Sequence, residues 1–186
     1  MDFNEYYFDL EDRMEKAVEN VRHEFVRIRT GRASIALLDG IRVEYYGSQS
    51  PLKQVGNLGT PEPRLITISV WDKNMVKEVE KAILKSDLGL TPSSQGQVVR
   101  VPIPALTEER RIELVKLVKR FAEDSRISVR NIRRDGNEHL KKEEKNHTIT
   151  EDEHHEALEK VQELTNKSIE KIDALLELKE KEIMEE

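Results

Sequence analysis

Four arginines within nine residues form the group of side chains best suited to binding chemistry in this sequence. They are Arg126, Arg130, Arg133 and Arg134. At about 100° of rotation per residue, an α-helix places them on one face, and Lys119 and Lys116 extend that face toward the N-terminus. Neighbouring guanidinium groups repel one another, so this arrangement does not help folding. Because arginine binds phosphate through two hydrogen bonds at once, the row predicts a phosphate-binding surface.

The helix that carries this row must also pack against the rest of the protein. Its apolar residues lie about a third of a turn from the arginines, so they can be buried while the row stays in water. These residues are Leu114, Val118, Phe121, Val129 and Ile132. Only Glu123 lies near the middle of the row to neutralise it. From Lys116 to Arg134 the row spans roughly 25 Å, which is long enough to follow an RNA backbone. A solvated face paired with neighbouring charges remains the alternative.

The composition favours long exposed helices over a thick globular core. Charged and hydrophobic residues each make up 37% of the chain, and aromatic residues only 5%. The net charge of −6 is unevenly distributed, since residues 108–145 carry 12 basic and 9 acidic side chains and residues 151–186 carry 5 and 13. At physiological salt, charges act over only about 8 Å. The local positive charge of residues 108–145 therefore permits nucleic-acid binding despite the net negative charge of the chain.

Several classes of protein are excluded by what the sequence lacks. It has no cysteine, and hence neither disulfides nor thiolate chemistry, which fits a reducing compartment. Its acidic N-terminus is not a signal peptide, and no run approaches the roughly 20 apolar residues of a membrane span. We expect a cytoplasmic protein with no membrane contact. No nucleotide-binding or hydrolase motif is present, and the adjacent His154 and His155 would point about 100° apart on a helix. We therefore expect no enzyme, no metal and no cofactor.

Three segments have the apolar spacing of long helices. The first covers residues 5–29, the second begins with Thr107 as N-cap and runs to about residue 146, and the third begins with Thr150 as N-cap. Three helices with one apolar stripe each are expected to form a bundle. Gly136 interrupts the second helix at a cost of up to about 1 kcal/mol relative to alanine. Close packing on its buried side is the simplest explanation, and alanine would stabilise an ordinary helix there.

The segment between the first two helices is of a different kind, because it holds all six prolines and seven of the eight glycines. Strands are expected at residues 41–46, 65–71 and 98–103, with a short helix at 74–85. The fold class is α+β: a bundle of residues 1–30 and 105–186 with an inserted β/α/β domain at 31–104. Two short connections restrict motion to bending. The expected hinge residues are Thr30, Gly31, Pro102 and Pro104.

Eight segments, in order along the chain, resemble the bacterial ribosome recycling factor family. They are Ile28-Arg-Thr-Gly-Arg-Ala33, Leu37-Leu-Asp-Gly40, Val43-Glu-Tyr-Tyr-Gly47, Pro61-Glu-Pro-Arg64, Ala82-Ile-Leu-Lys-Ser-Asp-Leu-Gly-Leu90, Leu106-Thr-Glu-Glu-Arg-Arg111, Val129-Arg-Asn-Ile-Arg-Arg-Asp135 and Lys181-Glu-Ile-Met184. Two positions depart from the family pattern: Gly136 stands where alanine is usual, and Thr91 where asparagine is usual.

The resemblance implies more than the residues alone. It implies an elongated, L-shaped, tRNA-like molecule that acts on the post-termination ribosome with elongation factor G and GTP, splitting the subunits and releasing mRNA and tRNA. In this likeness the bundle lies on ribosomal RNA of the large subunit, and the translocase pushes the inserted domain. GTP hydrolysis belongs to the translocase, so the protein itself is not an enzyme.

The resemblance also assigns residues. The family's RNA-contacting arginines correspond to Arg130, Arg133 and Arg134, with Arg29 and Arg32 near the hinge. We add Arg126, Lys119 and Lys116 because they share the helical face. We expect a monomer. The alternative is a helical adaptor that binds another protein through its bundle, has no role with RNA and uses the basic row only for solubility.

Overall fold

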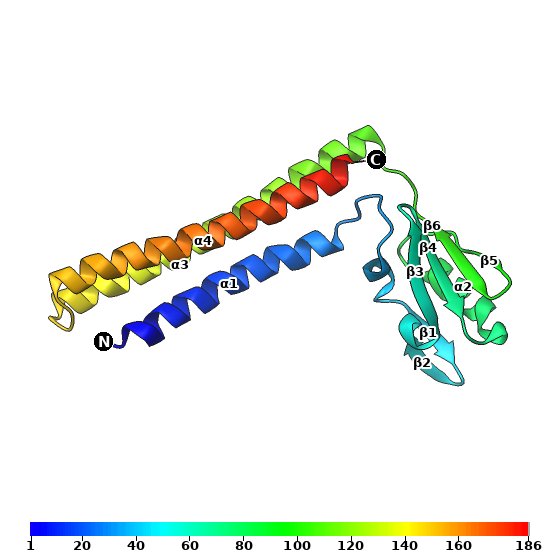
Figure 1. Ribbon diagram of the computed structural model, residues 1–186, viewed down its shortest axis with the longest axis horizontal. Coiled ribbons are helices and arrows are strands. Elements are labelled where there is room, and N and C mark those ends of the chain that lie inside the picture. The colour runs from blue at the N-terminus through cyan, green and yellow to red at the C-terminus, as the bar shows by residue number, and fades with distance from the viewer. Residues whose placement is uncertain (186) are drawn as a thin grey trace. The chain divides into compact units, whose positions relative to one another are not determined.

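Three long helices, α1 (Phe3–Arg27), α3 (Glu108–Lys145) and α4 (Glu151–Met184), form a bundle. The computed structural model describes residues 1–185, and Figure 1 shows the three helices running side by side. The predicted helices are confirmed, with observed ends within about two residues of those expected. α3 and α4 are joined by the short turn at residues 146–150, so they run antiparallel.

Side-chain caps fix where these helices begin. The Asp2 carboxylate accepts hydrogen bonds from the backbone N–H groups of Asn4 and Glu5 at 2.9 and 3.2 Å. At the start of α4, Thr150 and Glu153 form a reciprocal capping box, as the sequence pattern of α4 suggests. Each cap satisfies backbone N–H groups that the helix itself leaves without a partner.

The bundle core is a narrow apolar seam in which small residues let the helices approach. Its buried hydrophobic side chains are Leu10, Met14, Ala17, Val18, Val21, Phe25, Leu114, Val118, Ala122, Val129, Leu140, Ile149, Ala157, Val161, Leu164, Ile172 and Ile183. The buried Ser125 hydroxyl donates to the carbonyl of Ala17 at 2.9 Å, which ties α3 to α1. The polar group is thus satisfied inside the seam.

Gly136 lies at a point of close contact between α3 and α1. The Tyr6 hydroxyl donates to the Gly136 carbonyl at 2.8 Å, and a Cβ at this position would lie 2.9 Å from that hydroxyl and 3.0 Å from Leu10. Burial, and secondarily Tyr7, raise the pKa of Tyr6, so the hydroxyl remains a donor. The interpretation as a packing glycine is confirmed. An added methyl group would meet the Tyr6 hydroxyl and Leu10, so we now expect alanine to destabilise the bundle at this position instead of stabilising it as in an ordinary helix.

The inserted segment contains six strands and one α-helix, α2 (Val76–Lys85). A four-stranded antiparallel sheet has the order β3 (Gly56–Glu62), β4 (Leu65–Val70), β6 (Val98–Pro102), β5 (Ser93–Gln95). A separate hairpin pairs β1 (Arg42–Tyr45) with β2 (Ser48–Pro51). The α+β class is confirmed. The β/α/β outline was too simple, because β2, β3 and β5 were not expected.

The chain divides into two compact units. One consists of Met1–Ile28 and the chain from Arg111 onward, and the other of Arg29–Arg110. The four expected hinge residues all belong to the second unit, which has its own apolar core around Ile66, Ile68 and Val99. Among residues 1–185, no helix is long and apolar enough to cross a membrane.

Candidate nucleic-acid interface

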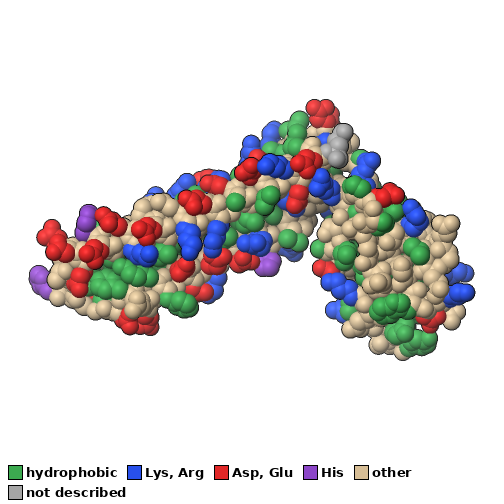
Figure 2. Space-filling model, in the orientation of Figure 1, with side chains coloured by type: hydrophobic (Ala, Val, Ile, Leu, Met, Phe, Trp, Pro, Cys, Tyr) green, Lys and Arg blue, Asp and Glu red, His purple; other side chains and the backbone are tan. Residues whose placement is uncertain are grey.

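The six predicted basic residues of the bundle all lie on α3, and α4 approaches several of them. Figure 2 shows that Lys and Arg side chains alternate with Asp and Glu side chains over the visible face of the bundle. This visible face is therefore not a broad positive field. Whether an individual side chain can take up a phosphate depends on its nearest partners.

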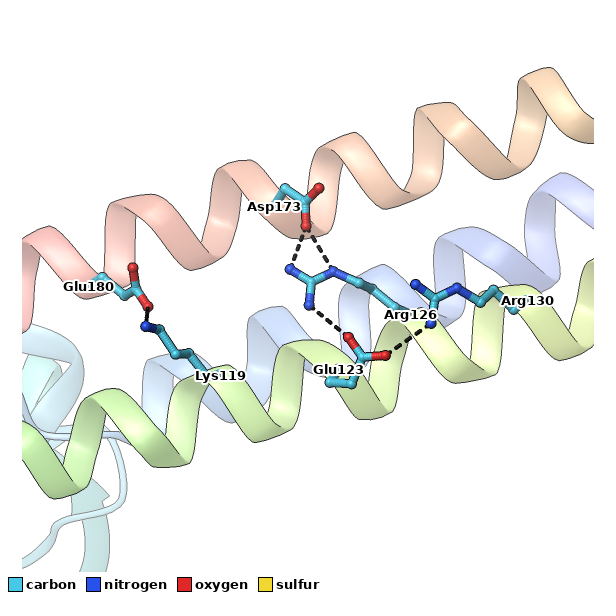
Figure 3. Close-up of polar contacts among 6 residues, drawn as sticks. All are labelled: Lys119, Glu123, Arg126, Arg130, Asp173 and Glu180. Atoms are coloured by element: carbon cyan, nitrogen blue, oxygen red, sulfur yellow. Dashed lines mark hydrogen bonds and ion pairs between the residues drawn. The ribbon is translucent and has the colours of Figure 1, made fainter.

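Arg126 is the most constrained member of the row. Its Nε and Nη2 donate to Asp173 Oδ1 of α4 at 2.8 and 2.5 Å, and its Nη1 donates to Glu123 at 3.0 Å (Figure 3). Its side chain is only 18% exposed. Burial opposes the charge, but the hydrogen bonds to Asp173 and Glu123 outweigh it and raise the pKa of Arg126. The expectation that Arg126 stays in water with only Glu123 beside it is wrong.

Lys119 repeats this arrangement one heptad earlier. Its Nζ lies 3.4 Å from Glu180 of α4 (Figure 3). Lys119 and Arg126 are seven residues apart on α3, as Asp173 and Glu180 are on α4, so two antiparallel helices bring the pairs into register. These two basic residues therefore join the helices, which the sequence reasoning missed.

Arg133 occupies the next position seven residues along α3, but α4 offers it no carboxylate. Its Nη1 donates to the amide oxygen of Gln162 at 3.2 Å, and the Gln162 amide donates in turn to Asn166 at 2.7 Å. The partner is neutral, so the positive charge of Arg133 is not compensated there. Asp135, the acid next in sequence to the row, is held by Arg13 of α1 at 2.9 Å.

The remaining residues of the row differ in their partners. Arg130 donates through Nη1 to Glu123 at 2.9 Å (Figure 3). The hydrogen bond from Arg130, followed by that from Arg126, lowers the pKa of Glu123. Arg134 and Lys116 are exposed, and the structure gives their side chains no hydrogen bond or ion pair within residues 1–185.

Arg29 and Arg32 belong to the inserted unit. Arg29 donates to the backbone carbonyl of Leu88 and, at 3.4 Å, to that of Asp87. These contacts fasten the first connection to the loop after α2, which gives Arg29 a structural role. Arg32 is exposed. The structure therefore brings the six α3 residues onto one helix and places these two in the other unit.

The sequence carries a spacing signal, although no register, for the α4 side chains that pair with the row. Asp173 and Glu180 repeat at seven residues, as do Lys119, Arg126 and Arg133, and antiparallel helices match such repeats. No group of three or more His, Asp or Glu side chains in residues 1–185 is arranged to hold a metal ion. What the arrangement offers within these residues is cationic donors without a carboxylate partner at both ends of the row, Lys116 at one end and Arg133 and Arg134 at the other.

The chain is similar to known proteins over nearly its whole length. The family model described as Ribosome recycling factor matches residues 21–184. The ribosome-recycling factor of Rickettsia peacockii (strain Rustic) is 56% identical over 176 residues, 95% of each chain, and that of Rickettsia africae (strain ESF-5) is 55% identical over the same share. A solution structure of the ribosome recycling factor superposes with a TM-score of 0.78 at 47% identity, covering 99% of this chain and 98% of that one.

A second solved structure adds a functional setting. It is described as models for the Thermus thermophilus ribosome recycling factor and the E. coli elongation factor G bound to the E. coli post-termination complex. The match has a TM-score of 0.67 and 43% identity, and covers 99% of this chain and all of that one.

Proposed function

This chain belongs to the ribosome recycling factor family, and from that membership we propose that it acts on the ribosome after termination. Together with elongation factor G and GTP, it separates the subunits and frees mRNA and tRNA. As a ribosome recycling factor it is not an enzyme, and the GTPase activity belongs to the elongation factor. The support is identity of 56% over 95% of the chain, together with a relative's structure on the post-termination complex.

The proposed RNA-binding surface is the basic row of α3, here divided into two parts. Arg130, Arg133, Arg134 and Lys116 bind ribosomal RNA of the large subunit, because their charges are exposed or only weakly paired. Arg126 and Lys119 add positive potential but remain bonded to α4. The observation that carries this division is the neutral Gln162 opposite Arg133, where the preceding positions have carboxylates.

The two connections between the units are proposed as the hinge. α1 ends at Arg27, because the C-cap residue Ile28 has an extended backbone, and the unit boundaries fall at residues 28/29 and 110/111. Arg29 is fastened to the inserted unit, and the Ile103 N–H donates to the Arg64 carbonyl at 2.8 Å. The expected hinge residues Thr30, Gly31, Pro102 and Pro104 therefore bend less than the residues that lie between them and the bundle unit. Arg32 lies beside the first connection.

Two assays test this function against the adaptor alternative. In the first, the protein is sedimented with purified large subunits across a salt series. A recycling factor sediments with the subunits and is released as salt rises, whereas an adaptor stays in the supernatant. In the second, purified ribosomes, elongation factor G and GTP are mixed with the protein, and subunit separation is followed by light scattering. A lack of splitting would contradict the proposal.

A further inference from the structure

Glu123 is the one acid of the described chain that bonds to two arginines of the basic row. Its Oε1 accepts from Arg130 at 2.9 Å and its Oε2 from Arg126 at 3.0 Å (Figure 3). Both oxygens of one carboxylate are thus shared between two guanidinium groups. This is the arrangement that two oxygens of an RNA phosphate would adopt on the same pair.

Glu123 and the bound phosphate must therefore compete. Arg130 has no other hydrogen-bond partner in residues 1–185, so a phosphate either takes the Nη1 donor and displaces the carboxylate or binds the remaining N–H donors right beside it. The hydrogen bonds from Arg130 and Arg126 lower the pKa of Glu123, which keeps the competitor ionised at neutral pH. An ionised carboxylate also repels any phosphate that binds next to it.

The other acids around the row cannot play this part. Asp173 bonds to Arg126 from α4, and that arginine is only 18% exposed, so its displacement would disturb the contact between helices. Asp135 is engaged by Arg13 of α1. Glu123 is 48% exposed and bonds only to arginines of its own helix, so it can swing aside at little cost.

We propose that Glu123 is a built-in competitor of RNA phosphate that limits the affinity of the α3 arginines for the ribosome. This inference rests on the proposed function. A recycling factor has to bind the large subunit and leave it again in every round. Tighter binding lowers the dissociation rate and so slows this release. A carboxylate placed within the arginine row weakens phosphate binding without removing an arginine.

The test replaces Glu123 by glutamine, which keeps the side-chain size and the helix while removing the charge. Affinity for purified large subunits is measured from 50 to 300 mM KCl, chosen as roughly the range over which phosphate contacts dissociate. We expect the variant to bind about three- to tenfold more tightly, since it no longer opposes each phosphate with a nearby charge. The logarithmic salt dependence should steepen by up to about one unit, because one more uncompensated cation meets the RNA.

Asp124→Asn is the matched control. It makes the same change in net charge one residue away, on a different face of α3, and its carboxylate has no hydrogen bond or ion pair in residues 1–185. Equal tightening by both variants would show a general effect of net charge and overturn the inference. Unchanged affinity in both Glu123→Gln and Glu123→Ala would also overturn it.

Arg133→Ala, measured in the same series, separates this inference from the proposed function. If Arg133→Ala weakens binding while the Glu123 variants do nothing, the RNA-binding surface stands and only the competitor is refuted. If Arg133→Ala is silent, the RNA-binding surface itself is refuted and the inference falls with it. Tighter binding in the glutamine variant should also slow multiple-turnover splitting, which a purely structural role of Glu123 would not produce.

Discussion

Replacing Arg133 by alanine removes the cation that the structure leaves least compensated in the partly buried seam between α3 and α4. In the free protein its guanidinium makes one 3.2 Å hydrogen bond, to a neutral amide. Loss of this single, exposed hydrogen bond to a neutral acceptor costs on the order of 0.5–1 kcal/mol, so the melting temperature should change by only a few degrees. Folding is therefore not expected to confuse the binding measurement.

The effect on binding should be much larger. A charge-assisted contact to phosphate contributes about 1–3 kcal/mol, which corresponds to a roughly 5- to 150-fold weaker Kd for the large subunit. The logarithmic salt dependence should become shallower by about one unit for the lost phosphate contact. Arg133→Lys should recover only part of the affinity, because an ammonium group lacks the planar fork. Sedimentation across a salt series measures all three quantities.

A reciprocal change leaves Arg133 in place and alters only its partner. Gln162→Glu puts a carboxylate where the amide now accepts the hydrogen bond, and so reproduces at Arg133 the situation of Arg126. The new surface ion pair should weaken subunit binding up to about fivefold. The control is Lys167→Ala, which removes an exposed cation of α4 that lies 3.7 Å from Glu11 of α1, away from the basic row, and which should be nearly silent. Equal losses from Arg133 and Lys167 would refute the reasoning, because overall charge would then explain both.

Three further predictions concern the scaffold. Gly136→Ala should lower the melting temperature through its collision with Tyr6, and Tyr6→Phe should restore part of the loss in the double variant; a rise in the melting temperature of the single variant would contradict this. In thermal unfolding, Arg126→Ala should destabilise the bundle more than Arg133→Ala does, yet it should weaken large-subunit binding less. The reverse order would refute the division of the row into RNA-binding residues and residues bonded to α4. Two glycines inserted between Ile28 and Arg29 should leave subunit binding intact and reduce splitting with elongation factor G, and full splitting would argue against force transfer through this connection.

The helices could be predicted because their signals are local. Thr107 and Thr150 mark the starts of α3 and α4, and an apolar residue every three or four positions marks their buried sides. Two strands of the inserted unit, β4 and β6, were predicted from buried β-branched runs, and β1 from the alternation of apolar and polar residues at 41–46. β2 and β5 consist mostly of serine and glutamine, and β3 contains glycines and a proline. Pairing with distant strands stabilises these segments, and no local pattern records it.

The face of α3 was also predictable, but the condition of each cation on it was not. Helical geometry places Arg126 and Arg133 on the same side from their numbering alone. Which of them is compensated depends on what α4 presents, and that follows only once the two helices are set antiparallel in a definite register. Asp173 is one of many acids on α4, and the hydrogen bonds that it accepts from Arg126 are what set it apart.

On the proposed RNA-binding surface, α4 therefore decides which cations of the row remain available to a phosphate. α4 offers Glu180 to Lys119 and Asp173 to Arg126, and at the next heptad step it offers the amides of Gln162 and Asn166. The carboxylates opposite Lys119 and Arg126 hold the two helices together and neutralise the positive charge of these side chains. The amides at the next heptad step still orient the guanidinium but leave its charge for a ligand. Because a neutral partner costs less to abandon than a charged one, phosphate can take Arg133 without loosening the bundle.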